Sequence, residues 1–177
     1  EPTLPRALLE PVSRPATLAV ADRTRDLLKA SGLVEIRLLP AVFPEELDAL
    51  RLAFDDVLRR SVRLANPMAG MGPLLSTTLL CGLLRAARRN LSRQVESVRI
   101  FEVGRIFLAR GPGELPDERL RAAALITRGE RASLWDSASP APLFFEAKGI
   151  AEGLLGELGQ HSVFHAGSAA PWLHPGA

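Results

Sequence analysis

The sequence predicts an α+β domain: an antiparallel sheet flanked by helices, with the helices packed to one side. A long apolar strand pattern over 97–108 and a run of alanine, leucine and isoleucine over 120–127 are separated by the turn Gly111-Pro112-Gly113 and indicate a hairpin at the centre of the sheet. Segments with helical periodicity lie before and after this hairpin. The 177 residues are 47% hydrophobic and 24% charged, which is enough for one domain with a real core. Hairpin strands with packed helices are typical of the α+β class.

The N-terminal half is expected to alternate helices and short strands. Residues 1–15 contain four prolines and predict an extended linker from a preceding domain. Apolar residues at helical spacing predict a helix over 16–30, and imperfect alternation predicts a strand over 33–39. A proline and two acids in a first turn predict a second helix over 44–59. Alternation predicts another short strand over 61–65.

Residues 74–90 form the strongest helix pattern in the chain. One face is expected to carry Leu75, Leu79 and Leu83, and the neighbouring face carries Leu80 and Leu84. An apolar surface this wide belongs in a core or a subunit contact.

The C-terminal half is expected to contain the hairpin, a loop, a helix and a last strand. In the first hairpin strand, a bulge near Gly104 is expected to shift the alternation. A loop is predicted over 129–142, a helix over 144–158 and a short strand over 162–165.

The single cysteine, Cys81, lies in an apolar run and is expected to be a buried, unreactive thiol. One cysteine forms neither an internal disulfide nor a cysteine metal site, which favours a reducing compartment. No apolar segment approaches the ~20 residues of a membrane helix. We therefore expect a soluble, cytoplasmic protein without a membrane partner.

Arginines offer a candidate contact to a phosphate backbone. The net charge is only +2 at a sequence pI of about 9.3, so nucleic-acid binding is permitted but not required. The best candidate surface consists of Arg85, Arg88, Arg89, Arg93 and Arg99. The alternative is the ordinary solvated face of an amphipathic helix, whose C-terminal end also favours cations.

A hydrolytic or metal site is a further alternative. Asp136 and Glu146 each lie beside an aromatic residue, and burial there would raise the pKa of a carboxyl. The histidines are His161, His165 and His174, of which the first two would share a face of a strand. No third ligand with suitable spacing is evident, and neither a phosphate loop nor a nucleophile elbow is present.

An ordered set of motifs carries a resemblance to a known family. The strand entry Gly32-Leu33-Val34-Glu35-Ile36 comes first, and the other matching positions are Asn66, Pro67, Leu83, Leu84, Asn90, Arg93, Phe101, Glu102, Gly104, Phe145, Lys148, Gly149, His174, Pro175 and Gly176. In this order they resemble the catalytic-like module of the bacterial phenylalanyl-tRNA synthetase β subunit. The chain departs from the family pattern at Ser76, Cys81, Glu146 and Ala147. These departures put polar contacts of the long helix in doubt and leave the fold expectation intact.

The resemblance implies a class II synthetase-like domain over residues 16–177, cut from a longer chain at its C-terminus. It implies no catalytic, cofactor-binding or metal-binding residue here, because ATP and Mg2+ would be used by the whole enzyme. The module would support an αβ heterotetramer in which the α subunit attaches phenylalanine to tRNA(Phe). Leu75, Leu79, Leu80, Leu83 and Leu84 are the predicted interface residues. Without the α subunit the chain is expected to self-associate, and a module that contacts tRNA independently through its arginines is the alternative.

Overall fold

The computed structural model describes residues 3, 12–127, 143–165 and 170–173. The elements in chain order are α1 (Ala16–Ala30), β1 (Val34–Glu35), β2 (Ala41–Val42), α2 (Pro44–Ala49), the 3-10 helix η1 (Val57–Arg59), β3 (Leu74–Leu75), α3 (Leu80–Leu91), β4 (Arg99–Leu108), β5 (Asp117–Ile126) and α4 (Leu143–Glu157).

The hairpin β4–β5 is the centre of the fold, as the two apolar segments predict. Its antiparallel register runs without interruption from Arg99 opposite Ile126 to Leu108 opposite Asp117. The predicted bulge at Gly104 is therefore wrong. A Cβ atom at Gly104 would lie 3.2 Å from both Glu102 Oε1 and Leu79 Cδ2, so the glycine serves close packing. Strand β1 adds to β4 in parallel, which the antiparallel prediction did not include.

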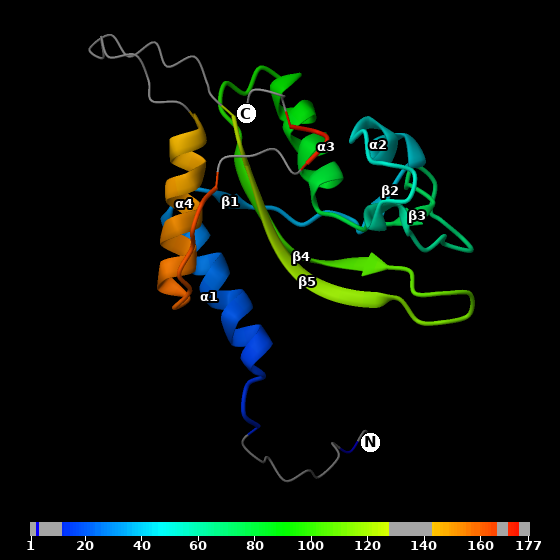
Figure 1. Cartoon of the computed structure of the whole chain (residues 1–177), viewed down its shortest axis with the longest axis horizontal. Helices are drawn as coiled ribbons and strands as arrows, with labels where there is room; N and C mark the ends of the chain where they lie inside the picture. Colours follow the sequence, from blue (N-terminus) through cyan, green and yellow to red (C-terminus); the bar gives the residue numbers. More distant parts are fainter. Residues whose placement is uncertain (1–2, 4–11, 128–142, 166–169, 174–177) are drawn as a thin grey trace.

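Helices cover both faces of this sheet. Ile100 packs with Leu83 and Ala87 of α3, whereas the next residue, Phe101, packs with Leu28 of α1 and with α4 on the opposite face. Figure 1 shows α3 on one side of the hairpin and α1 beside α4 on the other. The prediction that helices pack to one side is wrong, because both faces of β4 are apolar and each needs a cover.

Helix α1 spans the predicted residues and is fixed to β1 by charge. Arg25 donates a 2.9 Å hydrogen bond to Glu35, and Lys29 approaches the same carboxylate at 3.0 Å. The hydrogen bond from Lys29 lowers the pKa of Glu35 most strongly, Arg25 adds to it, and burial opposes both. This pair of cations holds the helix at the edge of the sheet.

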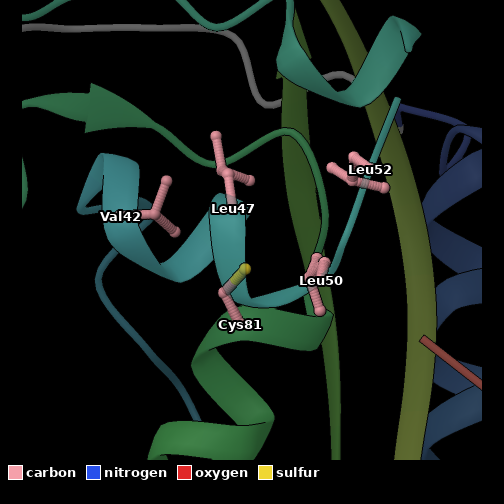
Figure 2. Packing of buried hydrophobic residues seen from close by; sticks show 5 residues of the cluster. All are labelled: Val42, Leu47, Leu50, Leu52 and Cys81. Carbon is pink, nitrogen blue, oxygen red and sulfur yellow. The ribbon is translucent and has the colours of Figure 1, made fainter. Parts of the chain in front are cut away.

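Helix α2 ends at Ala49, ten residues before the predicted end at Arg59. Arg51 takes a positive φ of 54°, which stops the helix. The turn allows Leu52 to join Leu47 and Leu50 in a cluster around Cys81 (Figure 2). A continuous helix would instead carry Leu52 away from the side of Leu47.

Helix α3 begins at Leu80, not at residue 74. Leu74 and Leu75 form β3, which pairs with β2, so the prediction of helix there is wrong. Two threonines lie between β3 and α3. Thr77 donates a 2.6 Å hydrogen bond to the carbonyl of Leu58, and Thr78 accepts one from the amide of Leu80. These local hydrogen bonds compete with helix formation and delay its start.

The remaining elements match the sequence in part. Helix α4 confirms the prediction over 144–158 within one residue at each end. Only an isolated bridge from Arg63 to Leu74 replaces the strand predicted over 61–65, and no strand forms at 162–165. The loop predicted over 129–142 and most of the linker at 1–15 lie outside the described residues, and the domain boundaries stay predictions.

Candidate subunit interface and basic surface

Helix α3 presents one buried and one exposed side. Leu83 is completely buried, and Ala87 packs with it on Val98 and Ile100 of the sheet. Leu84 and Leu91 are 44% and 45% exposed. They are seven residues apart and therefore share one face of the helix. We call this pair, Leu84 and Leu91, the α3 stripe.

The predicted interface leucines separate into different environments. Leu75 lies in β3, where it is half-buried, and Leu79 and Leu83 are buried in the core of this chain. Leu80 is half-buried against the cluster around Cys81. The wide apolar surface was expected to lie in a core or a subunit contact, and the chain's own sheet covers the face of Leu83, whereas Leu84 stays exposed. Leu84 is the predicted residue with the largest exposed surface.

The predicted basic surface is also divided. Arg85 forms a 3.2 Å ion pair with Glu46 and ties α3 to α2, and Arg99 forms an ion pair with Glu146 that joins β4 to α4. Arg88, Arg89 and Arg93 are exposed and form no ion pair with any described residue. These three arginines are the members of the predicted basic surface whose positive charge is not neutralised by a described acid, so they are the ones that could bind an anionic partner.

The residues predicted for a hydrolytic or metal site are not brought together in the described part of the chain. Glu146 is held by Arg99, and Asp136 and His174 lie outside the described residues. His161 and His165 lie in irregular chain after α4. Among the described residues no three histidine, cysteine or acidic side chains form a group that would hold a metal ion. Cys81 is buried as predicted, and burial raises the pKa of its thiol to about 11, which agrees with the expectation of an unreactive cysteine.

A cavity beside β4 was not predicted as a site. It has a volume of about 260 Å3 and lies between Leu38, Ser76, Leu79 and Glu102. Glu102 is 7% exposed, and its Oε1 atom accepts a 3.1 Å hydrogen bond from the amide of Leu38. Burial raises the pKa of this carboxyl, opposed by the Leu38 hydrogen bond and by the charge of Arg37. The sequence signal for this cavity is an acid, Glu102, in the middle of an apolar strand.

Glu102→Gln is expected to stabilise the chain at neutral pH. Because folding raises the pKa of Glu102, the contribution of this carboxyl to stability is fully present below the ordinary value of 4.5 and is lost as pH rises through the folded pKa. Glutamine keeps the acceptor for Leu38 and does not ionise. Urea unfolding at a series of pH values should show a higher free energy of unfolding for the variant than for the wild type at neutral pH. Well below pH 4.5 the two proteins should differ little. An equal gain at every pH would contradict a titration at Glu102.

The described residues leave much apolar surface open. Seventeen hydrophobic residues are buried, whereas twenty large hydrophobic side chains are exposed. Helix α4 has no buried residue, and its Phe144 and Phe145 are 63% and 61% exposed. Scattered exposed leucines are normal on a monomer, but an apolar helix without a buried residue needs further cover.

The family model described as "Phenylalanyl tRNA synthetase beta chain CLM domain" matches residues 1–177. The chain belongs to this family. The resemblance seen in the ordered motifs is thereby confirmed.

Relatives in the family are similar over most of this chain. The phenylalanine-tRNA ligase beta subunit of Syntrophus aciditrophicus is 33% identical over 98% of the chain, which is 22% of that protein. The corresponding subunit of Symbiobacterium thermophilum is 40% identical over 86% of the chain and 17% of that protein. This chain thus spans about a fifth of the length of these relatives.

The solved structures confirm the class II fold of this family member. Pyrrolysyl-tRNA synthetase from Desulfitobacterium hafniense superimposes with a TM-score of 0.57 at 19% identity and covers 84% of this chain and 49% of that one. At this identity the likeness concerns the fold alone. Within the described residues no helix is long and apolar enough to cross a membrane.

Proposed function

We propose that this chain is a non-catalytic module of a phenylalanine-tRNA ligase β subunit and that it supports assembly with the α subunit into an αβ heterotetramer. The whole ligase would charge tRNA(Phe) with phenylalanine in the cytoplasm. The observation that carries this proposal is the excess of exposed over buried large apolar side chains in the described residues. Obligate subunit interfaces are large and apolar, and they cover surface of this kind.

The α3 stripe is the part of this surface that we assign to the α subunit. Leu84 and Leu91 project from a helix that is itself fixed on its other side by Leu83 and Ala87. The ion pair between Arg85 and Glu46 further limits movement of the helix. A rigid element that exposes apolar side chains loses little conformational entropy on binding.

The ATP- and Mg2+-dependent chemistry belongs, in this proposal, to the whole ligase and not to this module. The described residues do not provide the group of acidic side chains that a magnesium ion prefers.

Leu84→Asp is expected to weaken capture of the chain by the α subunit at least about thirtyfold, as for a central interface residue. The carboxylate would replace an apolar contact and would have to lose its hydration in the complex, while the exposed site lets the free chain fold. Affinity is measured by surface plasmon resonance with the α subunit immobilised, and circular dichroism checks folding.

Leu115→Asp is the matched control, because Leu115 is 86% exposed in the turn between β4 and β5, away from α3. Equal affinity of both variants and the wild type would contradict the assignment of the α3 stripe. Equal loss in both would indicate a non-specific effect of the added charge and would also contradict it.

Contact with tRNA is the second candidate function, supported by the exposed and unpaired Arg88, Arg89 and Arg93. Replacing all three by alanine is expected to lower tRNA affinity and to reduce the slope of log K against log salt by about 2. Arg105 and Arg119, which pair with acids on the hairpin, provide the control double variant. Filter binding over a salt series measures the slope, and an unchanged slope in the triple variant would remove this function.

A further inference from the structure

Strand β5 forms one edge of the three-stranded sheet and turns a row of backbone groups outwards. The carbonyl of Phe101 accepts a 2.8 Å hydrogen bond from the amide of Ile36, next to β1, so the odd-numbered residues of β4 face β1 and the even-numbered ones face β5. In the register of the hairpin, the odd-numbered residues of β5 are then hydrogen-bonded to β4. The amides and carbonyls that point outwards belong to Glu118, Leu120, Ala122, Ala124 and Ile126.

This row of outward groups is open in the described part of the chain. Strand β5 pairs there with β4 and with no further strand. The carbonyl of Leu120 accepts a 3.1 Å hydrogen bond from the exposed side chain of Arg121, a local bond that an incoming amide can replace. An open edge of ten residues is a template for another strand.

The two halves of this edge differ in charge. Residues 117–121 include two acids and two arginines, whereas residues 122–126 are Ala-Ala-Ala-Leu-Ile, without the charge, proline or glycine that blunts an edge. The opposite edge of the sheet is blunted, because β1 is only two residues long and its Glu35 is held by Arg25 and Lys29. Of the two edges of the sheet, β5 is therefore the one that favours pairing, and its apolar half is the favoured part.

We propose that β5 pairs with β5 of a second copy of this chain, antiparallel and with the two-fold axis at Ala123. In this register Leu120 lies opposite Ile126 of the second copy, and Ala122 lies opposite Ala124. All four of these residues have outward backbone groups, so each pair exchanges two hydrogen bonds. The pairs are also apolar on apolar and small on small, and Leu120, now 37% exposed, gains a cover.

Charge favours this register over its neighbours. With the axis at Ala123, Arg121 lies opposite Leu125 of the second copy, whose surface its aliphatic stem covers, and Arg119 lies opposite Thr127. An axis at Arg121 would place that arginine opposite itself, and an axis at Ala122 would place the two Arg121 side chains diagonally. Like charges directly opposite each other destabilise a strand pair, and long side chains still meet across the diagonal.

The symmetry of this contact limits the assembly to a dimer. A two-fold pair uses the open edge of both copies at once and leaves the blunted β1 edges outside. The result is one continuous sheet with three strands from each copy. This interaction goes beyond assembly with the α subunit, because it uses β5 and a second copy in place of the α3 stripe.

Sedimentation velocity of the 177-residue chain tests for this dimer. At a concentration on the order of 100 μM, a species of twice 19.1 kDa is expected, and it should dissociate on dilution. Ala122→Pro removes an outward amide that β4 does not use, and the symmetric pair loses two hydrogen bonds, so dimerisation should weaken at least about tenfold. Ala122→Val keeps the amide and should dimerise like the wild type. A wild type that stays monomeric, or a dimer that Ala122→Pro leaves unchanged, would overturn the proposal.

Ala123→Cys gives a second test that does not depend on a proline in β5. In the proposed register Ala123 lies opposite itself in a non-hydrogen-bonded pair, where Cα atoms are ~4.5 Å apart and within reach of a disulfide. Mild oxidation should therefore link this variant into covalent dimers. Leu115→Cys, at a residue that is 86% exposed in the β4–β5 turn, is the control, and Cys81 is buried in both variants. No covalent dimer from Ala123→Cys, or equal amounts from the two variants, would contradict pairing through β5.

Discussion

Leu83→Ala is expected to lower the free energy of unfolding by about 3 kcal/mol. Leu83 is completely buried between α3 and the sheet, where it contacts Ala87, Val98 and Ile100. Truncation removes buried methyl groups and leaves a cavity that the hydrogen-bonded strand β4 cannot close by moving. Chemical denaturation followed by circular dichroism measures the loss.

Leu84→Ala is the control for this prediction, because the neighbouring residue is 44% exposed on the other side of the helix. Its expected cost is about 0.5 kcal/mol. A similar loss of unfolding free energy in both variants would contradict the orientation of α3, because Leu84 would then have to be buried as well.

Gly72→Ala is expected to destabilise the chain by about 3 kcal/mol or more, through a clash with the backbone. A Cβ atom at Gly72 would lie 2.1 Å from the carbonyl carbon of Val42 and 2.6 Å from the amide nitrogen of Phe43. These atoms connect β2 to α2, and Val42 is part of the buried cluster around Cys81. The clash is relieved only if the segment around Gly72 and the backbone of Val42 and Phe43 move apart.

Gly153→Ala tests whether the effect at Gly72 is steric. Gly153 lies within α4, and a Cβ atom there would meet nothing within 4 Å. Alanine favours the helix, so a gain of about 0.5–1 kcal/mol is expected. Thermal unfolding compares the two variants. Near-equal stability of Gly72→Ala and the wild type would show that the loop before β3 does not pack on β2 as described.

The long, regular elements could be predicted from the sequence. Helix α1 and helix α4 have apolar residues at helical spacing over fifteen residues each, and β4 is a run of ten residues rich in apolar side chains. Local composition and period decide such long elements. The family could also be recognised, since its motifs occur in order along the chain.

Tertiary contacts decided the elements that were predicted wrongly. Leu74 and Leu75 match the helix pattern that follows them, but pairing with Ala41 and Val42 makes them a strand. Phe54 matches a helix that includes Leu47 and Leu50, yet it is 99% exposed because the chain turns at Arg51. Neither the partner strand nor the turn is visible in the local period of the sequence.

The candidate surfaces were predictable only as sets of residues. The sequence identified the leucines and arginines of α3, but it did not show which side of the helix the sheet would cover. Because of this packing, Leu83 is buried and Leu84 is exposed. The cavity beside Glu102 joins residues from three distant segments around positions 38, 76 and 102. Such a site depends on the packing of α3 on β4, for which the sequence has no local pattern.

Hydrogen-deuterium exchange of the chain with and without the α subunit tests the assembly proposal most directly. Binding should slow exchange over residues 84–91, where the α3 stripe lies, and leave the turn at residues 109–116 unchanged. Slowed exchange at the turn alone, or no change anywhere at saturating α subunit, would contradict the account.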